Sequence, residues 1–84
     1  MTEPLMRTVA ELAAFLALSG DDVVNPDVAV SQLEQMAMFL KELSAPERTE
    51  LKDFLHRLAD TEAQRPGGED RAEFFRTLVE NLGI

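Results

Sequence analysis

The segment SAPERTELKDFLHRLAD, residues 44–60, decides the fold class because it holds both the start signal and the apolar stripe of one helix. Ser44 and Glu47 have the spacing of a capping box, in which each side chain accepts a hydrogen bond from the other residue's backbone N–H. Pro46 suits a first helical turn because the amide that it lacks has no intrahelical partner there. The apolar residues then recur at i, i+3, i+4 and i+7, the spacing of a single helical face: Leu51, Phe54, Leu55 and Leu58. This segment therefore predicts an amphipathic helix over residues 46–63.

Similar signals predict three more helices. Asn25, Pro26 and Asp27 read as an N-cap, a first-turn proline and an acid near the positive end of the helix dipole. Glycines that can adopt the left-handed conformation are placed to end helices: Gly20, Gly67, Gly68 and Gly83. We therefore predict an all-α, small antiparallel four-helix bundle in a single domain (1–84), with helices at about residues 4–18, 26–43, 46–63 and 69–81.

The first helix has two candidate start positions. Thr8 and Glu11 match a capping box that would begin the helix at Thr8, whereas Pro4 suits a first turn farther upstream. We expect the longer helix, which begins near Pro4.

The composition is that of a globular chain without cysteine. Of its 84 residues, 45% are hydrophobic and 29% are charged, which is too apolar for intrinsic disorder. Without Cys, neither a disulfide nor a thiolate metal site can stabilise so small a core. The apolar N-terminal stretch contains Glu3, Arg7 and Glu11, unlike a secretory signal, and no apolar window is long enough to span a membrane. We expect a cytoplasmic protein.

The chain is strongly acidic, and its first half almost lacks bases. Sixteen Asp and Glu residues against eight Lys and Arg residues give a formal charge of −8, which disfavours nucleic acid and anionic lipid as partners. Up to Leu40 the only base is Arg7, whereas six acids precede that point: Glu3, Glu11, Asp21, Asp22, Asp27 and Glu34. Either a basic protein binds this half of the chain or the charge serves solubility.

The first two predicted helices carry more apolar surface than a four-helix core needs. The second helix is apolar over an arc of about 200°, and the first is apolar almost all round after Leu12. Either the first helix is central to the fold, or another chain covers part of this surface. We predict a partner-binding surface on these helices, with Phe39 as its anchor, formed by Phe15, Leu18, Met36, Met38, Phe39, Asp21, Asp22 and Asp27.

The chain lacks the motifs of the common enzyme and metal-binding classes. Its one histidine, His56, falls on the charged side of its helix, and neither Cys nor a phosphate-binding glycine loop is present. A calcium loop starting at Asp21 would place Val23, Pro26 and Gln32 where an EF-hand needs a ligand, a glycine and a glutamate. We therefore expect no catalytic residue, no metal and no cofactor.

In size, acidity and helix count the chain is similar to acyl carrier proteins and to the immunity proteins of nuclease bacteriocins. A carrier protein needs an Asp-Ser pair at the start of its second helix, where this chain has Asn25-Pro26-Asp27-Val28. An immunity protein binds its enzyme with tyrosines, which this chain lacks. The sequence therefore assigns no family.

Three functions agree with these features. The first is a non-catalytic protein–protein interaction module that self-associates through its first two helices as a homodimer or larger homo-oligomer. The second is an antitoxin-type or immunity-type inhibitor of a basic enzyme. The third is a carrier of a small apolar ligand, in a cavity lined by Phe15, Phe39, Phe54, Phe74 and Phe75.

Overall fold

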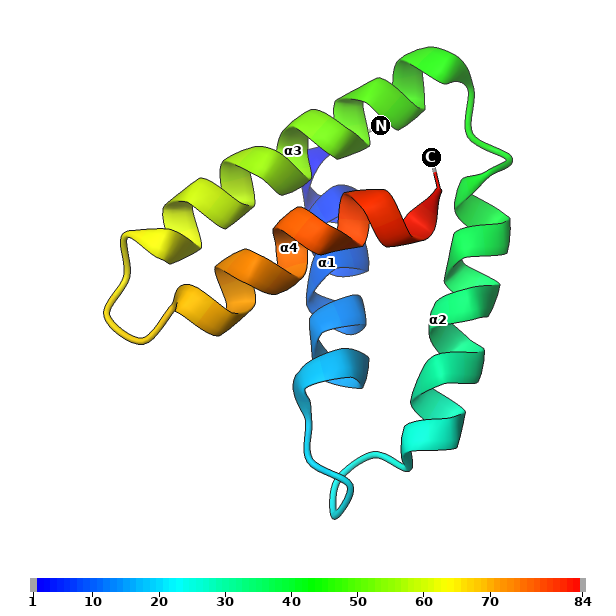
Figure 1. Cartoon of the computed structure of the whole chain (residues 1–84). Coiled ribbons are helices and arrows are strands. Elements are labelled where there is room, and N and C mark those ends of the chain that lie inside the picture. The colour runs from blue at the N-terminus through cyan, green and yellow to red at the C-terminus, as the bar shows by residue number, and fades with distance from the viewer. Residues whose placement is uncertain (1, 84) are drawn as a thin grey trace.

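The computed structural model describes residues 2–83, which form four α-helices joined by short connections (Figure 1). Their bounds are Glu3–Leu18 for α1, Pro26–Leu40 for α2, Ala45–Ala63 for α3 and Glu69–Leu82 for α4. The described part of the chain contains no strand. The predicted all-α bundle of four helices is therefore confirmed.

The longer of the two predicted forms of α1 is the one observed. Pro4 lies in the first turn, and the hydroxyl of Thr8 donates to the carbonyl of Pro4 at 2.9 Å. Threonine inside a helix makes this bond to the preceding turn, whereas a capping threonine accepts a bond from the following one. Thr8 is therefore an interior residue of α1.

The predicted end of α2 and the predicted conformation of two glycines differ from the structure. α2 ends at Leu40 instead of residue 43, because the N–H groups of Glu42 and Leu43 bond to carbonyls three residues back, at 3.1 and 3.2 Å. Such bonds tighten a last turn toward 3₁₀ geometry. Within residues 2–83 a positive φ occurs at Gly67 and Gly83, so the left-handed conformation predicted for Gly20 and Gly68 is wrong.

The predicted N-caps of α2 and α3 are confirmed. The Asn25 side chain accepts hydrogen bonds from the backbone N–H of Asp27 at 2.9 Å and of Val28 at 3.4 Å. Ser44 and Glu47 form the reciprocal capping box, with bonds of 3.3 Å to the Ser44 hydroxyl and 3.0 Å to the Glu47 carboxylate. These side chains satisfy amide groups that the helices themselves leave without partners.

The helices pair into two antiparallel hairpins that cross each other (Figure 1). α3 and α4 pack closely along their lengths, and α1 and α2 form the other hairpin. The lower half of the α1–α2 hairpin extends beyond α3 and α4 in Figure 1. The α3–α4 hairpin therefore covers only the upper part of the α1–α2 hairpin.

α1 packs against each of the other three helices, and so does α4. Its small residues Ala10, Ala13 and Ala14 are buried and let the neighbouring helices approach closely. The rest of the core consists of larger apolar residues from all four helices, namely Met6, Leu40, Leu51, Leu55, Leu58, Phe75, Leu78 and Leu82, together with Ala59. The sequence left open whether α1 is central to the fold or shares surplus apolar surface with α2; α1 contacts all three other helices, and part of its apolar surface remains exposed.

A buried carboxylate connects three helices. Glu62 of α3 is 2% exposed, and its two oxygens accept hydrogen bonds from Arg65 Nη1 at 2.7 Å and from Arg71 Nε at 3.2 Å. Arg71, on α4, also donates from Nη2 to Glu11 Oε1 of α1 at 2.6 Å. Its guanidinium carbon lies 5.2 Å from the centroid of the Phe75 ring. This network ties α1 and α4 to the end of α3.

The capping box of α3 gives a pH-dependent contribution to stability. Hydrogen bonds from the backbone N–H of Ser44 and with its hydroxyl hold the pKa of Glu47 below its ordinary value of 4.5. Because the folded-state pKa is lowered, the contribution is fully present above the ordinary value and is lost as pH falls through the folded-state pKa. We expect Ser44→Ala to raise the pKa of Glu47, as measured by NMR titration of its carboxyl carbon.

A matched control for this titration is Thr49→Ala. It also removes a hydroxyl from the first turns of α3, but that hydroxyl donates to the carbonyl of Ala45. The pKa of Glu47 should stay unchanged in this variant. An unchanged pKa in Ser44→Ala as well would show that the Ser44 hydroxyl does not lower the pKa of Glu47 in solution.

Candidate protein-binding surfaces

The exposed large apolar side chains lie on one half of the molecule. In α3 and α4 the apolar stripes are buried or half-buried. Across residues 2–83, the exposed large apolar side chains all fall between residues 5 and 39, and they are Leu5, Leu12, Phe15, Leu18, Val23, Val28, Val30, Met38 and Phe39. The α1–α2 hairpin is therefore the part of the bundle with unpartnered apolar surface.

On the side of the α1–α2 hairpin away from α4, the residues at helical spacing from Val9 and Met36 are uncharged and mostly apolar. Val9 of α1 and Met36, Phe39 and Leu40 of α2 line a shallow depression of about 210 Å³ where the two helices meet. Leu5 and Leu12 continue the surface at helical spacing from Val9. We call this surface the uncharged face, formed by Leu5, Val9, Leu12 and Phe15 of α1 and by Val28, Gln32, Met36 and Phe39 of α2.

Three of the residues predicted to bind a partner lie on the uncharged face, and two other apolar ones do not. Phe15, Met36 and Phe39 belong to it. Met38 is 67% exposed, as is Phe39, but successive helical residues point about 100° apart, and Met38 is directed away from α1. Leu18 lies on the side of α1 opposite α2. The structure therefore does not bring Met38 and Leu18 together with the other three.

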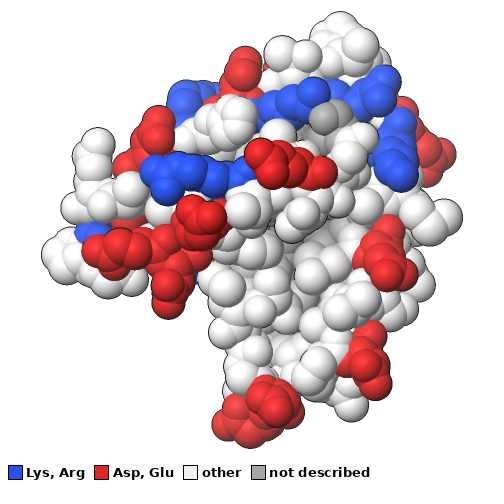
Figure 2. Space-filling view, viewed as in Figure 1, with Lys and Arg blue, Asp and Glu red and all other residues white. Residues whose placement is uncertain are grey.

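The opposite side of the hairpin contains a groove between α1 and α2. Its lower part has a volume of about 400 Å³ and is lined by Leu16 and Ala17 of α1, by Val30 and Leu33 of α2, and by Asp21 of their connection. The groove continues past Leu33 into a hollow of about 170 Å³ between α2 and α4, where its lining includes Glu34, Phe74 and Leu78. Figure 2 shows this side of the molecule, with the uncoloured hollow below α4. We call the two hollows together the acidic groove.

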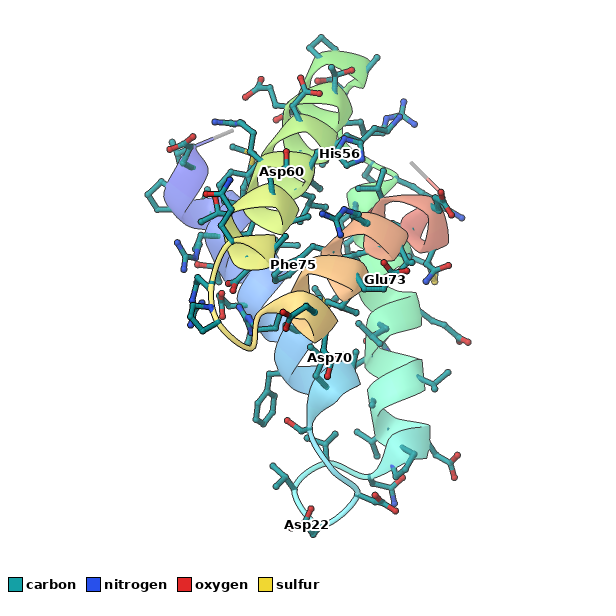
Figure 3. All side chains as sticks on the ribbon, turned by 60° about the vertical axis from the view of Figure 1, so that its left-hand side comes forward. Asp22, His56, Asp60, Asp70, Glu73 and Phe75 are labelled. Atoms are coloured by element: carbon teal, nitrogen blue, oxygen red, sulfur yellow. The ribbon has the colours of Figure 1, made fainter. Side chains whose placement is uncertain are left out.

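Carboxylates border the acidic groove, and no Lys or Arg is among the residues that line its two hollows. Between residues 8 and 40 there is no Lys or Arg, and in Figure 2 the lower part of the α1–α2 hairpin is red without blue. Asp21 and Glu34 line the groove, Asp27 follows Pro26 at its edge, and Asp22 lies at the tip of the connection (Figure 3). Within residues 2–83 none of these four carboxylates forms an ion pair.

Neither a metal site nor a cavity lined by the phenylalanines is formed within residues 2–83. His56 is exposed on α3, far from the tip of the α1–α2 connection (Figure 3), and residues 2–83 hold no cluster of three or more His, Asp or Glu residues suited to a metal ion. The five phenylalanines do not line one cavity, because Phe75 is buried in the core whereas Phe15 and Phe39 are exposed.

Sequence reasoning missed several residues of the two surfaces. Leu5 and Val9 were not among the predicted residues, although their spacing with Leu12 is a helical repeat that the sequence displays. Ala17 and Val30 were also missed. Their role in the groove depends on where α4 stops covering the α1–α2 hairpin, which no local pattern indicates.

Comparison of the chain with protein-family models, with curated proteins and with solved structures finds no match. Among residues 2–83 no helix combines the length and the apolar character needed to cross a bilayer.

Proposed function

We propose that this protein is a non-catalytic interaction module that self-associates through the uncharged face of α1 and α2. The observation that carries the proposal is the concentration of exposed large apolar side chains on this hairpin. Contiguous apolar surface of this kind is unfavourable in water and marks contact sites in soluble proteins.

The absence of charge favours a second copy of the chain as the occupant of the uncharged face. Each chain carries a formal charge of −8, so two copies repel one another wherever their carboxylates meet. The uncharged face lets two copies approach with their acidic residues turned away. In a symmetric dimer the same face serves both subunits, so its apolar residues meet apolar residues.

The size of the face agrees with a dimer. The 16 residues of α1 give a length of about 24 Å, and two neighbouring helices about 10 Å across present roughly 500 Å² in projection. Because side chains protrude from the helices, the accessible area is larger than the projected area. It approaches the roughly 800 Å² per partner that is usual in stable complexes. Phe39, at the junction of the two helices, is its expected anchor.

The test is Phe39→Asp, measured by analytical ultracentrifugation over a range of concentrations. We expect a dimer in the parent protein and a monomer in the variant, with the dissociation constant raised at least about tenfold, because a carboxylate would be buried against an apolar surface. The helical circular dichroism should be retained, since Phe39 is largely exposed in the subunit.

Met38→Asp is the matched control. Met38 has the same 67% exposure as Phe39 and neighbours it on α2, so the variant adds the same charge but outside the uncharged face. It should dimerise almost as the parent does. A parent protein that stays monomeric at high micromolar concentration, or two variants that weaken association equally, would contradict the proposal.

A cytoplasmic location belongs to the same proposal, supported by the absence of cysteine from the sequence.

A further inference from the structure

The acidic groove has the shape of a site for one helix. It follows α2 from Pro26 to Ala37, which corresponds to about 16 Å, or three helical turns. Its floor is apolar and contains small side chains such as Ala17 and Ala29. A partner helix could therefore lie between α1 and α2 with its apolar side facing Val30 and Leu33.

The charged residues around the floor of the groove determine which charge the partner helix should carry. Asp21 and Glu34 line the groove, and Asp27 lies beside it on the first turn of α2. Asp70 borders it from the first turn of α4, since Asp70 lies on the same side of that helix as Phe74. No Lys or Arg lines either hollow, so these carboxylates favour a cationic ligand.

From this combination we infer that the acidic groove binds an amphipathic helix of a basic protein, with leucine-like residues on the floor and Lys or Arg against the bordering carboxylates. A second copy of the chain is a poor occupant, because its own α1 and α2 are as acidic as the groove. The site is separate from the uncharged face, on the opposite side of the hairpin, so one subunit can hold both partners. An inhibitor of a basic enzyme would use the groove in this way.

The experiment uses a synthetic helical peptide of about 14 Leu, Ala and Lys residues, and a second peptide in which Glu replaces every Lys. Binding to the full chain is followed by fluorescence anisotropy and by NMR shifts of the backbone amides. We expect the Lys peptide to bind, with shifts at Ala17, Val30 and Leu33, and its affinity to fall about tenfold between low and high ionic strength. The Glu peptide should not bind.

Two pairs of substitutions test the carboxylates. Asp21→Asn with Glu34→Gln removes two negative charges from the groove. It should lower the affinity for the Lys peptide about threefold to tenfold, as expected for two exposed ion pairs. Asp53→Asn with Glu80→Gln removes the same charge from exposed positions on α3 and α4 and should leave the affinity nearly unchanged. Ala17→Gln, which fills the floor without adding charge, should also weaken binding.

Peptide binding by the Phe39→Asp protein distinguishes this inference from the proposed self-association. The monomeric Phe39→Asp protein should bind the Lys peptide as well as the parent does, because Phe39 is outside the groove. Equal binding of both peptides, shifts centred on Val9 and Leu12, or equal effects of the two paired substitutions would overturn the inference. So would a weaker dimer in Asp21→Asn with Glu34→Gln, since the groove carboxylates would then contact a second copy.

Discussion

Replacing Arg71 by Met should lower the free energy of unfolding by about 3 kcal/mol, a large part of the stability of so small a domain. Arg71 donates to Glu62 Oε1 and to Glu11 Oε1, at 3.2 and 2.6 Å. Its removal leaves one oxygen of the buried Glu62 carboxylate without a donor, and a charge that is buried without its partner is costly. Met keeps the length of the side chain and its contact with Phe75, so the loss reports mainly on the carboxylate.

The measurement is urea unfolding followed by circular dichroism, with the double substitution Glu62→Leu and Arg71→Met as its partner. The double substitution removes the buried charge together with its donor, and replacing a buried ion pair by apolar residues is often neutral or stabilising. We expect it to recover most of the stability lost in Arg71→Met. A double variant as unstable as the single one, or a single variant within about 1 kcal/mol of the parent, would show that the Glu62 network contributes little.

The Glu62 network is a feature of the fold that could not be predicted from the sequence. The helices, the caps at Asn25 and Ser44 and the buried stripe of α3 were predicted because each depends on residues within one or two turns. The Glu62 network was not, since Arg71 is nine residues from Glu62 and 60 from Glu11 in the chain. Charge spacing within one helix can also predict the wrong ion-pair partner.

Arg57 illustrates the point about charge. The sequence places Asp53 four residues before it, in the order that stabilises an isolated helix. In the structure Arg57 Nη1 instead pairs with Glu3 Oε1 of α1 at 3.2 Å. A helix packed in a bundle offers its side chains partners on neighbouring helices, and these partners cannot be found from spacing within one helix.

The sequence indicated that the first two helices carry surplus apolar surface, but it did not indicate which residues share one face of the hairpin. The width of the apolar arc on α2 indicated surplus apolar surface on the first two helices, and eight of the nine exposed large apolar side chains lie on them, with Val23 in their connection. Helical spacing separates Phe39 from Met38 by about 100° and favoured Phe39 as the anchor, but it does not indicate which of the two joins the apolar surface of α1. Their separation depends on the side from which α1 approaches α2, which is a property of the assembled hairpin.

Gly68→Ala should also cost about 3 kcal/mol or more, and it should cost more than Gly67→Ala. Gly67 has a φ of 75°, in the left-handed region, but a Cβ there would meet nothing within 4 Å, so Ala costs only the conformational strain of about 1–2 kcal/mol. Gly68 has an ordinary φ of −91°, but its Cβ would lie 2.0 Å from the carbonyl oxygen of Glu62 and 3.2 Å from that of Arg65.

Both contacts of a Gly68 Cβ are with backbone atoms, which cannot swing aside as the end of a side chain can, so the end of α3 or the start of α4 must move. That movement would displace Glu62 and Arg65 from the network with Arg71, which adds to the steric cost. Urea unfolding of the two variants gives the comparison directly. If Gly67→Ala proved the more harmful, the left-handed conformation rather than the close approach of α4 to the end of α3 would be what requires glycine in this turn.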